Sequence, residues 1–103
     1  MLTKKQDAFE KKAYEWCTIY EYDRKREKVS FSVAEIEKRY PEHGTAINEE
    51  CEERYYVIEG KATLHLQGER TKIAKGDTIS IPKNKAYRLK VRDPIKLAII
   101  STP

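Results

Sequence analysis

The chain has 103 residues, of which 37% are charged and 39% are hydrophobic, and its formal net charge at pH 7 is +4. This length is enough for one domain with a modest core. No apolar run approaches the roughly 18 residues of a membrane-spanning helix, and the first residues lack the apolar segment of a secretory signal. We therefore expect a single-domain cytoplasmic protein that does not bind membranes.

The charge is unevenly distributed along the chain. Residues 61–103 contain 10 basic and 3 acidic side chains, whereas residues 29–60 contain 3 basic and 8 acidic ones. A basic half is one mark of nucleic-acid binding. However, its basic residues are interleaved with strand and turn residues and need not share one face; they include Lys83, Lys85, Arg88, Lys90 and Arg92. We expect no nucleic-acid partner, and the opposite charges of the two halves favour pairing of subunits into a homodimer.

The two cysteines, Cys17 and Cys51, are too few for a disulfide framework. Their separation also excludes a C-x-x-C metal or redox motif. We expect both to be buried or unreactive thiols.

The first predicted element is a short helix over residues 3–16. Thr3 and Gln6 form a capping-box pattern, and Phe9, Ala13 and Trp16 form one apolar stripe at helical spacing. We therefore expect residues 1–16 to be a helical extension that covers one end of a domain formed by residues 17–103.

From Cys17 onward, apolar and polar residues alternate, which is typical of half-buried strands. A charged turn is predicted at residues 23–27. About eight short strands at intervals near ten residues predict an all-β antiparallel sandwich or barrel. They cover residues 17–22, 29–36, 55–58, 62–66, 70–74, 78–81, 86–91 and 96–101.

Two blocks in this pattern have a recurring spacing. Glu53 precedes Gly60 with six residues between them, and Gly76 precedes Pro82 with five between them. This arrangement resembles the two motifs of the cupin family over residues 28–102. The resemblance implies a small single-domain, cupin-type jelly-roll barrel, here with a short N-terminal helix.

The same resemblance identifies the positions at which metal-binding cupins hold their ion. The two histidines of the first motif would correspond to Ile47 and Glu49 or to Ala46 and Asn48, and the histidine of the second motif to Tyr87. Of the usual four ligands only Glu53 is present.

A transition-metal site needs about three protein ligands, usually including imidazole. We therefore expect no such metal and no other cofactor. A hard cation on the acidic run Glu49–Glu53 remains an alternative, although side chains alternate along a strand and cannot all point one way. His43, in a turn, and His65, which alternates with leucines, are expected at the surface.

Strand alternation and the resemblance together predict a site inside the barrel. Glu53, Tyr55 and Val57 should share the inner face, and Tyr87 should point toward Glu53. The predicted ligand contacts are Glu53, Tyr55, Tyr87 and Asn48, with walls that include Ile79, Ile81 and Leu89. Alternatively, the same polar groups satisfy one another in a filled core.

Three functions follow from these alternatives. The first is a metal-free domain that binds a small, carbohydrate-like ligand in the barrel. The second is a sugar epimerase or isomerase type of enzyme, with Glu53 as base and Tyr87 as acid, the two candidate catalytic residues. The third is a structural or interaction module that acts as a homodimer with a filled barrel. An open cavity larger than about 300 Å³ would favour ligand binding.

Overall fold

The computed structural model describes residues 2–22 and 29–103, so the charged turn predicted at residues 23–27 lies outside the described residues. The described chain is almost wholly β-structure, with a single short 3-10 helix before the first strand. The elements are η1 (Lys5–Asp7), β1 (Phe9–Tyr14), β2 (Cys17–Glu21), β3 (Ser30–Ile36), β4 (Arg39–Tyr40), β5 (Glu52–Leu66), β6 (Glu69–Ala74), β7 (Thr78–Ile81) and β8 (Tyr87–Thr102).

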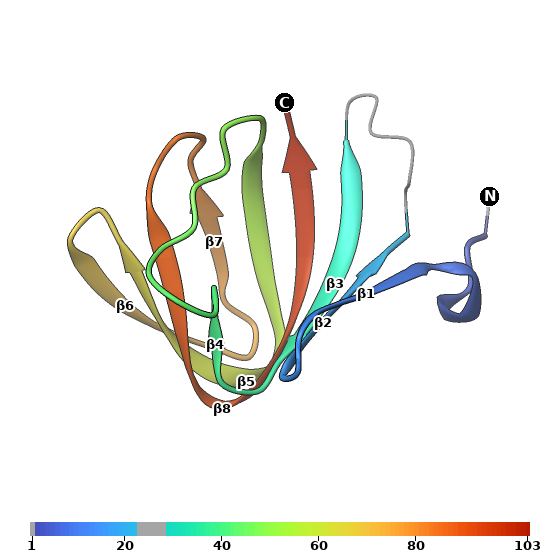
Figure 1. Cartoon of the computed structure of the whole chain (residues 1–103), viewed down its shortest axis with the longest axis horizontal. Coiled ribbons are helices and arrows are strands. Elements are labelled where there is room, and N and C mark those ends of the chain that lie inside the picture. The colour runs from blue at the N-terminus through green and yellow to red at the C-terminus, as the bar shows by residue number, and fades with distance from the viewer. Residues whose placement is uncertain (1, 23–28) are drawn as a thin grey trace.

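Two long antiparallel strands, β5 and β8, form the centre of the sheet. The first half of β5 pairs with the second half of β8, and its second half pairs with the first half of β8. Both strands bend where the two halves meet, at the closed end of the V in Figure 1. The bend produces two facing layers, one with the order β1-β2-β3-β8-β5-β7 and the other with the order β4-β8-β5-β6. This arrangement is the antiparallel sandwich that the strand spacing predicts, with the jelly-roll form that the resemblance implies.

The bend also explains why the number of strands differs from the prediction. Strands expected on either side of Gly60 are one continuous strand, as are those expected on either side of Asp93 and Pro94. Gly60 has a positive φ of 93°, and a Cβ there would collide with the Pro94 carbonyl oxygen and lie 2.6 Å from the Ile95 Cα. Glycine therefore allows the two long strands to cross closely at the bend instead of ending there.

The helix predicted over residues 3–16 is wrong in extent. Only Lys5–Asp7 is helical, and residues 9–14 form β1, which pairs with β2. The apolar stripe is not maintained, because Phe9 is 41% exposed while Ala13 and Trp16 pack against the core. A short helix alone is marginal, whereas a strand on the free edge of β2 gains ladder hydrogen bonds.

The core lies between the two layers. Tyr55 and Val57 point inward and Arg54 and Tyr56 point outward, as alternation along β5 predicts. No helix among the described residues is long and apolar enough to cross a membrane. The buried residues are Cys17, Ala34, Ile36, Tyr55, Val57, Ala62, Leu64, Ile73, Ile81, Tyr87, Leu89, Ile95, Leu97 and Ile99.

Candidate functional site

A cavity of about 430 Å³ opens between the two layers, and all four predicted ligand contacts line it: Asn48, Glu53, Tyr55 and Tyr87. Its apolar lining residues are Cys17, Ile19, Phe31, Ala34, Ile36, Ala46, Ile47, Leu97 and Ile99. The predicted wall residues Ile79, Ile81 and Leu89 are not among the lining residues. For Ile79 and Ile81 the strand order explains the difference, because β8 and β3 lie on one side of the first half of β5 and β7 lies on the other. Leu89 belongs to the other layer, in the half of β8 that pairs with β4. The cavity is on the β3 side.

Two buried phenols meet inside this cavity from different elements. Tyr55 is on β5, and Tyr87 begins β8; each is 3% exposed. The Tyr55 hydroxyl donates a hydrogen bond to the Tyr87 hydroxyl oxygen over 3.1 Å, and the rings meet edge to face with centroids 6.4 Å apart. The bend in β5 and β8 brings these residues together, although 32 positions separate them.

The carboxylate of Glu53 belongs to the same network. Ser101 is directly opposite Glu53 in the β5–β8 ladder, and its hydroxyl donates to the Glu53 Oε2 over 3.3 Å. Sequence reasoning missed Ser101, but its alternation with Leu97 and Ile99 on the last strand was a usable signal. No buried side-chain nitrogen or oxygen among the described residues lacks a hydrogen-bond partner. The polar groups therefore satisfy one another, and the cavity beside them is nevertheless open.

The phenols have acidities that reflect this setting. Burial raises the pKa of Tyr87 above its usual range, and the negative charge of Glu53 raises it further, as does the hydrogen bond between the two side chains. Burial likewise raises the pKa of Tyr55, followed by the effects of Tyr87 and Glu53. Both phenols are therefore protonated at neutral pH. Because the Tyr87 oxygen accepts the hydrogen bond from Tyr55, the Tyr87 hydroxyl is available to donate to Glu53, to Tyr40 or to a ligand.

Tyr40 is a second residue that sequence reasoning missed. It lines the cavity from β4, and its ring stacks on that of Tyr87 with centroids 6.3 Å apart and an interplanar angle of 29°. Burial raises the pKa of Tyr40. The two-residue strand that positions it is too short for an alternation signal.

Asn48 lies at the rim and has a structural role there. Its Oδ1 accepts hydrogen bonds from the backbone N–H groups of Glu50, over 3.0 Å, and Cys51, over 2.9 Å. Its backbone carbonyl accepts one from the Asn84 N–H over 2.8 Å. The side-chain oxygen therefore holds the turn before β5, which leaves the amide N–H₂ as the group that could reach a ligand.

The cavity is lined by more acidic than basic side chains. Glu21, Glu49, Glu50 and Glu53 line it, and Lys11 is the basic residue among its lining residues. Such a field attracts cations, tolerates neutral molecules and repels anions. It therefore disfavours phosphorylated ligands.

The donor set does not fit a transition-metal centre. Glu53 is hydrogen-bonded to Ser101 and surrounded by protonated phenols, whereas His43 and His65 line a different hollow. Within residues 2–22 and 29–103, no group of three or more histidine, cysteine, aspartate or glutamate side chains is placed to hold a metal ion. Cys17, which also lines the cavity, is a free thiol whose pKa burial raises to about 11.

With this geometry established, comparison with known families is informative. The family described as "Cupin domain" matches residues 33–102, more than half of the chain. This protein belongs to the cupin family. The matched range includes both motif blocks, from Glu53 to Gly60 and from Gly76 to Pro82.

Other proteins resemble this cupin in part or throughout. The uncharacterized protein MJ1618 of Methanocaldococcus jannaschii is 35% identical over 54 residues, which are 50% of this chain and 43% of that protein. The solved structure of Pac13, a nucleoside dehydratase from Streptomyces, has a TM-score of 0.86 at 14% identity and covers 100% of this chain and 82% of its own. That of KdgF from Halomonas sp. has a TM-score of 0.83 at 11% identity, with coverage of 100% and 94%. These likenesses show the fold.

Proposed function

We propose that this cupin binds a small, uncharged, hydroxyl-rich ligand with a ring, such as a sugar or a nucleoside, inside the barrel. The observation that supports this most directly is the cavity of about 430 Å³ beside the hydrogen-bonded group Glu53, Tyr87 and Tyr55. Ligand pockets commonly have volumes of about 300–1,000 Å³ and few polar groups in an apolar wall. A barrel filled by its own side chains would leave no such space.

The groups around the cavity define the ligand chemistry. Glu53 accepts hydrogen bonds from hydroxyl groups, and the protonated Tyr87 and Tyr55 can both donate and accept. Tyr40, which also lines the cavity, adds an aromatic contact for a sugar ring or a base beside Tyr87. Because Glu21, Glu49 and Glu50 surround the cavity, a phosphate on the ligand would be repelled.

One similar structure is consistent with a ligand of this size. Variants of Pac13 in which a histidine is replaced by glutamine or a tyrosine by phenylalanine were solved with uridine. Their identity to this chain is 13–14%, so the fold is what they share. A nucleoside therefore belongs among the first ligands to test.

An enzyme is the second candidate, because Glu53 and Tyr87 are hydrogen-bonded to each other. A carboxylate beside a protonated phenol can exchange protons with a bound substrate. Binding requires only the open cavity and its polar lining, whereas an epimerase further requires that Glu53 and Tyr87 contact opposite faces of the reacting carbon. We therefore favour binding over the epimerase function.

A thermal-shift series tests the proposal. Millimolar uridine or a neutral sugar should raise the melting temperature, since a ligand that binds only the native state stabilises it. Uridine 5′-monophosphate should raise it less, and Glu49→Gln/Glu50→Gln should reduce that difference.

Two variants locate the binding and separate it from catalysis. Tyr87→Phe should reduce the shift, whereas the matched control Tyr56→Phe, on the outer face, should not. Product formation from any stabilising compound that disappears in Glu53→Gln would establish the enzyme instead. If no uncharged sugar or nucleoside shifts the melting temperature, the proposed function is wrong.

We also propose that two copies of the cupin pair through the outer face of β3, β8 and β5. Phe31 lies opposite Ile100 there, and in the next row Ala98 lies opposite Tyr56. The exposed fractions of Phe31, Ile100 and Tyr56 are 38%, 43% and 49%. Large apolar side chains gathered on one exposed face are typical of subunit interfaces.

A further inference from the structure

A second hollow, of about 1320 Å³, lies on the outer face of the layer formed by β4, β8, β5 and β6. It shares no lining residue with the cavity between the layers. Glu37 and Glu42 are its two acidic lining residues. Its seven basic lining residues are Lys38, Arg39, Arg70, Lys72, Arg88, Lys90 and Arg92.

The strand register places these basic residues side by side. In one row, Arg88 on β8 and Arg70 on β6 are both directly opposite His65 on β5. In the next row, Lys90 and Lys72 are both opposite Thr63. Arg39 on β4 extends this second row, because it lies opposite Lys90. Alternation along each strand therefore collects on one face residues that were not expected to share one.

In the absence of a binding partner, this concentration of like charge lowers the stability of the folded protein. Like charges on neighbouring strands repel each other, and among the residues that the structure describes no ion pair involves Arg70, Lys72, Arg88 or Lys90. The effect is visible at the centre of the face. Burial lowers the pKa of His65, and the positive charges of Arg88, Arg70 and Lys90 lower it further.

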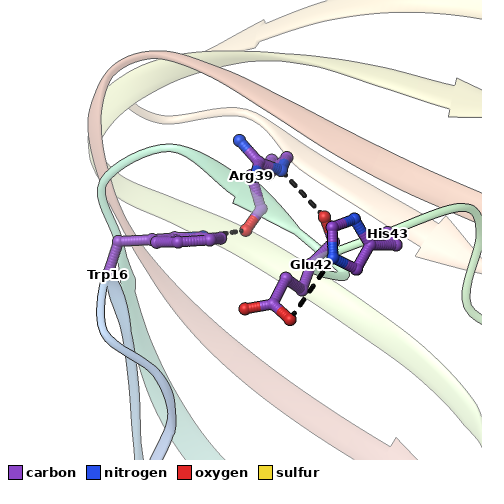
Figure 2. Close-up of polar contacts among 4 residues, drawn as sticks. All are labelled: Trp16, Arg39, Glu42 and His43. Atoms are coloured by element: carbon purple, nitrogen blue, oxygen red, sulfur yellow. Dashed lines mark hydrogen bonds and ion pairs between the residues drawn. The ribbon is translucent and has the colours of Figure 1, made fainter.

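One wall of the hollow is held in place by specific contacts, shown in Figure 2. The Trp16 Nε1 donates a hydrogen bond to the Arg39 carbonyl oxygen over 2.8 Å, and the Arg39 Nε donates to the Glu42 carbonyl oxygen over 2.8 Å. The Arg39 guanidinium and the Lys38 ammonium also lie 4.6 Å and 5.3 Å from the Trp16 ring centroid. These contacts restrict the conformations of the Lys38 and Arg39 side chains before any partner binds.

We propose that this outer face, referred to below as the basic face, binds the phosphodiester backbone of a nucleic acid without reading its sequence. Basic residues two positions apart on a strand are about 6.6 Å apart, and the rows add a second dimension of positive charge. In the part of the chain that the structure describes, the hollow is lined by no phenylalanine, tyrosine or tryptophan on which bases could stack. Contacts to phosphates position a protein on nucleic acid but specify no bases.

Two other polyanionic surfaces fit the basic face less well. An anionic membrane usually also requires apolar side chains that insert into the lipid, and the exposed lining residues of the hollow are charged or polar. The acidic residues of a second copy are spread along its chain: Glu21, Glu49 and Glu50 line its cavity, whereas most of the 17, such as Glu10 and Glu59, do not. Neither presents the long, regular row of negative charges that the basic face matches.

Fluorescence anisotropy with a labelled 20-nucleotide RNA and a labelled 20-base-pair DNA tests this proposal. The full chain should bind at least one of them at 50 mM salt, and the affinity should fall steeply with salt as counterions are released. Arg88→Glu/Lys90→Glu should weaken binding by at least about tenfold. The matched control Lys83→Glu/Lys85→Glu changes the net charge equally outside the hollow and should weaken it by less than about twofold.

Four results would overturn the proposal. The first two are absence of binding to both nucleic acids at 50 mM salt and equal weakening of binding by the two double variants. The third is tighter binding to vesicles that contain anionic lipid than to either nucleic acid. The fourth is an oligomer in size-exclusion chromatography that dissociates in Arg88→Glu/Lys90→Glu, which would show that a second copy covers the basic face. Circular dichroism should show that both double variants are folded. Arg88→Gln/Lys90→Gln, which adds no negative charge, provides a second measurement if the glutamate pair is unfolded. The thermal shift produced by a cavity ligand should be unchanged in these variants, so the two proposals fail separately.

Discussion

At the scale of single residues, the distinctive feature of the barrel interior is a network of polar side chains formed by two tyrosines, a glutamate and a serine. Tyr55 donates to Tyr87, Ser101 donates to the Glu53 Oε2, and the Glu53 carboxylate also interacts with Tyr87. Glu53 is partly buried, and a carboxylate withdrawn from water without partners is unfavourable. The network removes that cost and keeps both phenols protonated beside an open cavity.

The raised pKa values of Tyr55 and Tyr87 predict a loss of stability in alkali. An unfolded tyrosine ionises near pH 10. The folded protein therefore holds more protons than the unfolded chain above that pH, and the contribution of the neutral phenols is full below about pH 10 and lost as the pH rises. Each phenol should steepen the fall by up to about 1.4 kcal/mol per pH unit.

Urea unfolding between pH 8 and 11.5 measures this effect. The double variant Tyr55→Phe/Tyr87→Phe should be less stable than the wild type at pH 8, by about 1 kcal/mol for the lost hydrogen bond. Its stability should then fall less steeply with pH, while the outer-face control Tyr56→Phe should follow the wild type. Parallel curves for the wild type and the double variant would contradict the assignment.

At the scale of elements, the bend in β5 and β8 determines the site. It folds two long strands into two layers, and it places Tyr87 from one layer against Tyr55 from the other. Gly60 makes the bend possible, because a side chain there would occupy the position of the Pro94 carbonyl. The cavity therefore depends on a residue that does not line it.

Substitution of two glycines separates backbone strain from steric collision. Gly60 and Gly76 have nearly equal φ values, +93° and +92°, but a Cβ at Gly76 would meet nothing within 4 Å. Gly76→Ala should cost about 1 kcal/mol for the φ alone. Gly60→Ala should cost at least about 2 kcal/mol more, since the backbones of β5 and β8 must separate.

Chemical denaturation of both variants checks this prediction. The prediction would also be confirmed if Gly60→Ala yielded no folded protein while Gly76→Ala yielded folded protein. Equal destabilisation by the two substitutions would show that the bend tolerates a side chain.

At the scale of the whole molecule, three surfaces differ in chemistry. The cavity is lined mainly by acidic and apolar residues, the outer face of β4, β8, β5 and β6 is basic, and the outer face of β3, β8 and β5 exposes large apolar side chains. The long strands contribute to all three because their residues alternate between faces and their halves belong to different layers. A substitution on one surface can therefore leave the other two intact, except at Phe31, which belongs to the apolar face and also lines the cavity.

The apolar face predicts a homodimer in solution. Light scattering coupled to size-exclusion chromatography should give the mass of two chains. Ile100→Lys should raise the dissociation constant of that dimer by at least about tenfold, because an ammonium directly opposite Arg54 would be buried unpaired, which costs more than about 1.4 kcal/mol. The exposed-turn control Lys85→Glu should leave it unchanged, and a monomeric wild type would refute the interface.

The sequence by itself determined the architecture and the inner face of β5. Period-two alternation and turn residues predicted an all-β antiparallel sandwich or barrel, and the spacing from Glu53 to Gly60 and from Gly76 to Pro82 resembled the cupin motifs, which implied a jelly roll. The same parity identified Glu53 and Tyr55 as inward-facing. These properties depend on neighbours along the chain, which a sequence displays directly.

Only the tertiary structure decided which distant residues meet. The bend at Gly60 allows segments that look separate in the sequence to form single long strands. Residues 9–14 form a strand instead of a helix because they pair with the free edge of β2. Tyr40 and Ser101 lie in the site because the fold brings them next to Tyr87 and Glu53. The basic face likewise formed from β4, β6 and β8, because cross-strand register aligned residues that the sequence separates. Register and layer packing are set by contacts between segments far apart in the chain, and local residue patterns do not encode which of those contacts is the most stable.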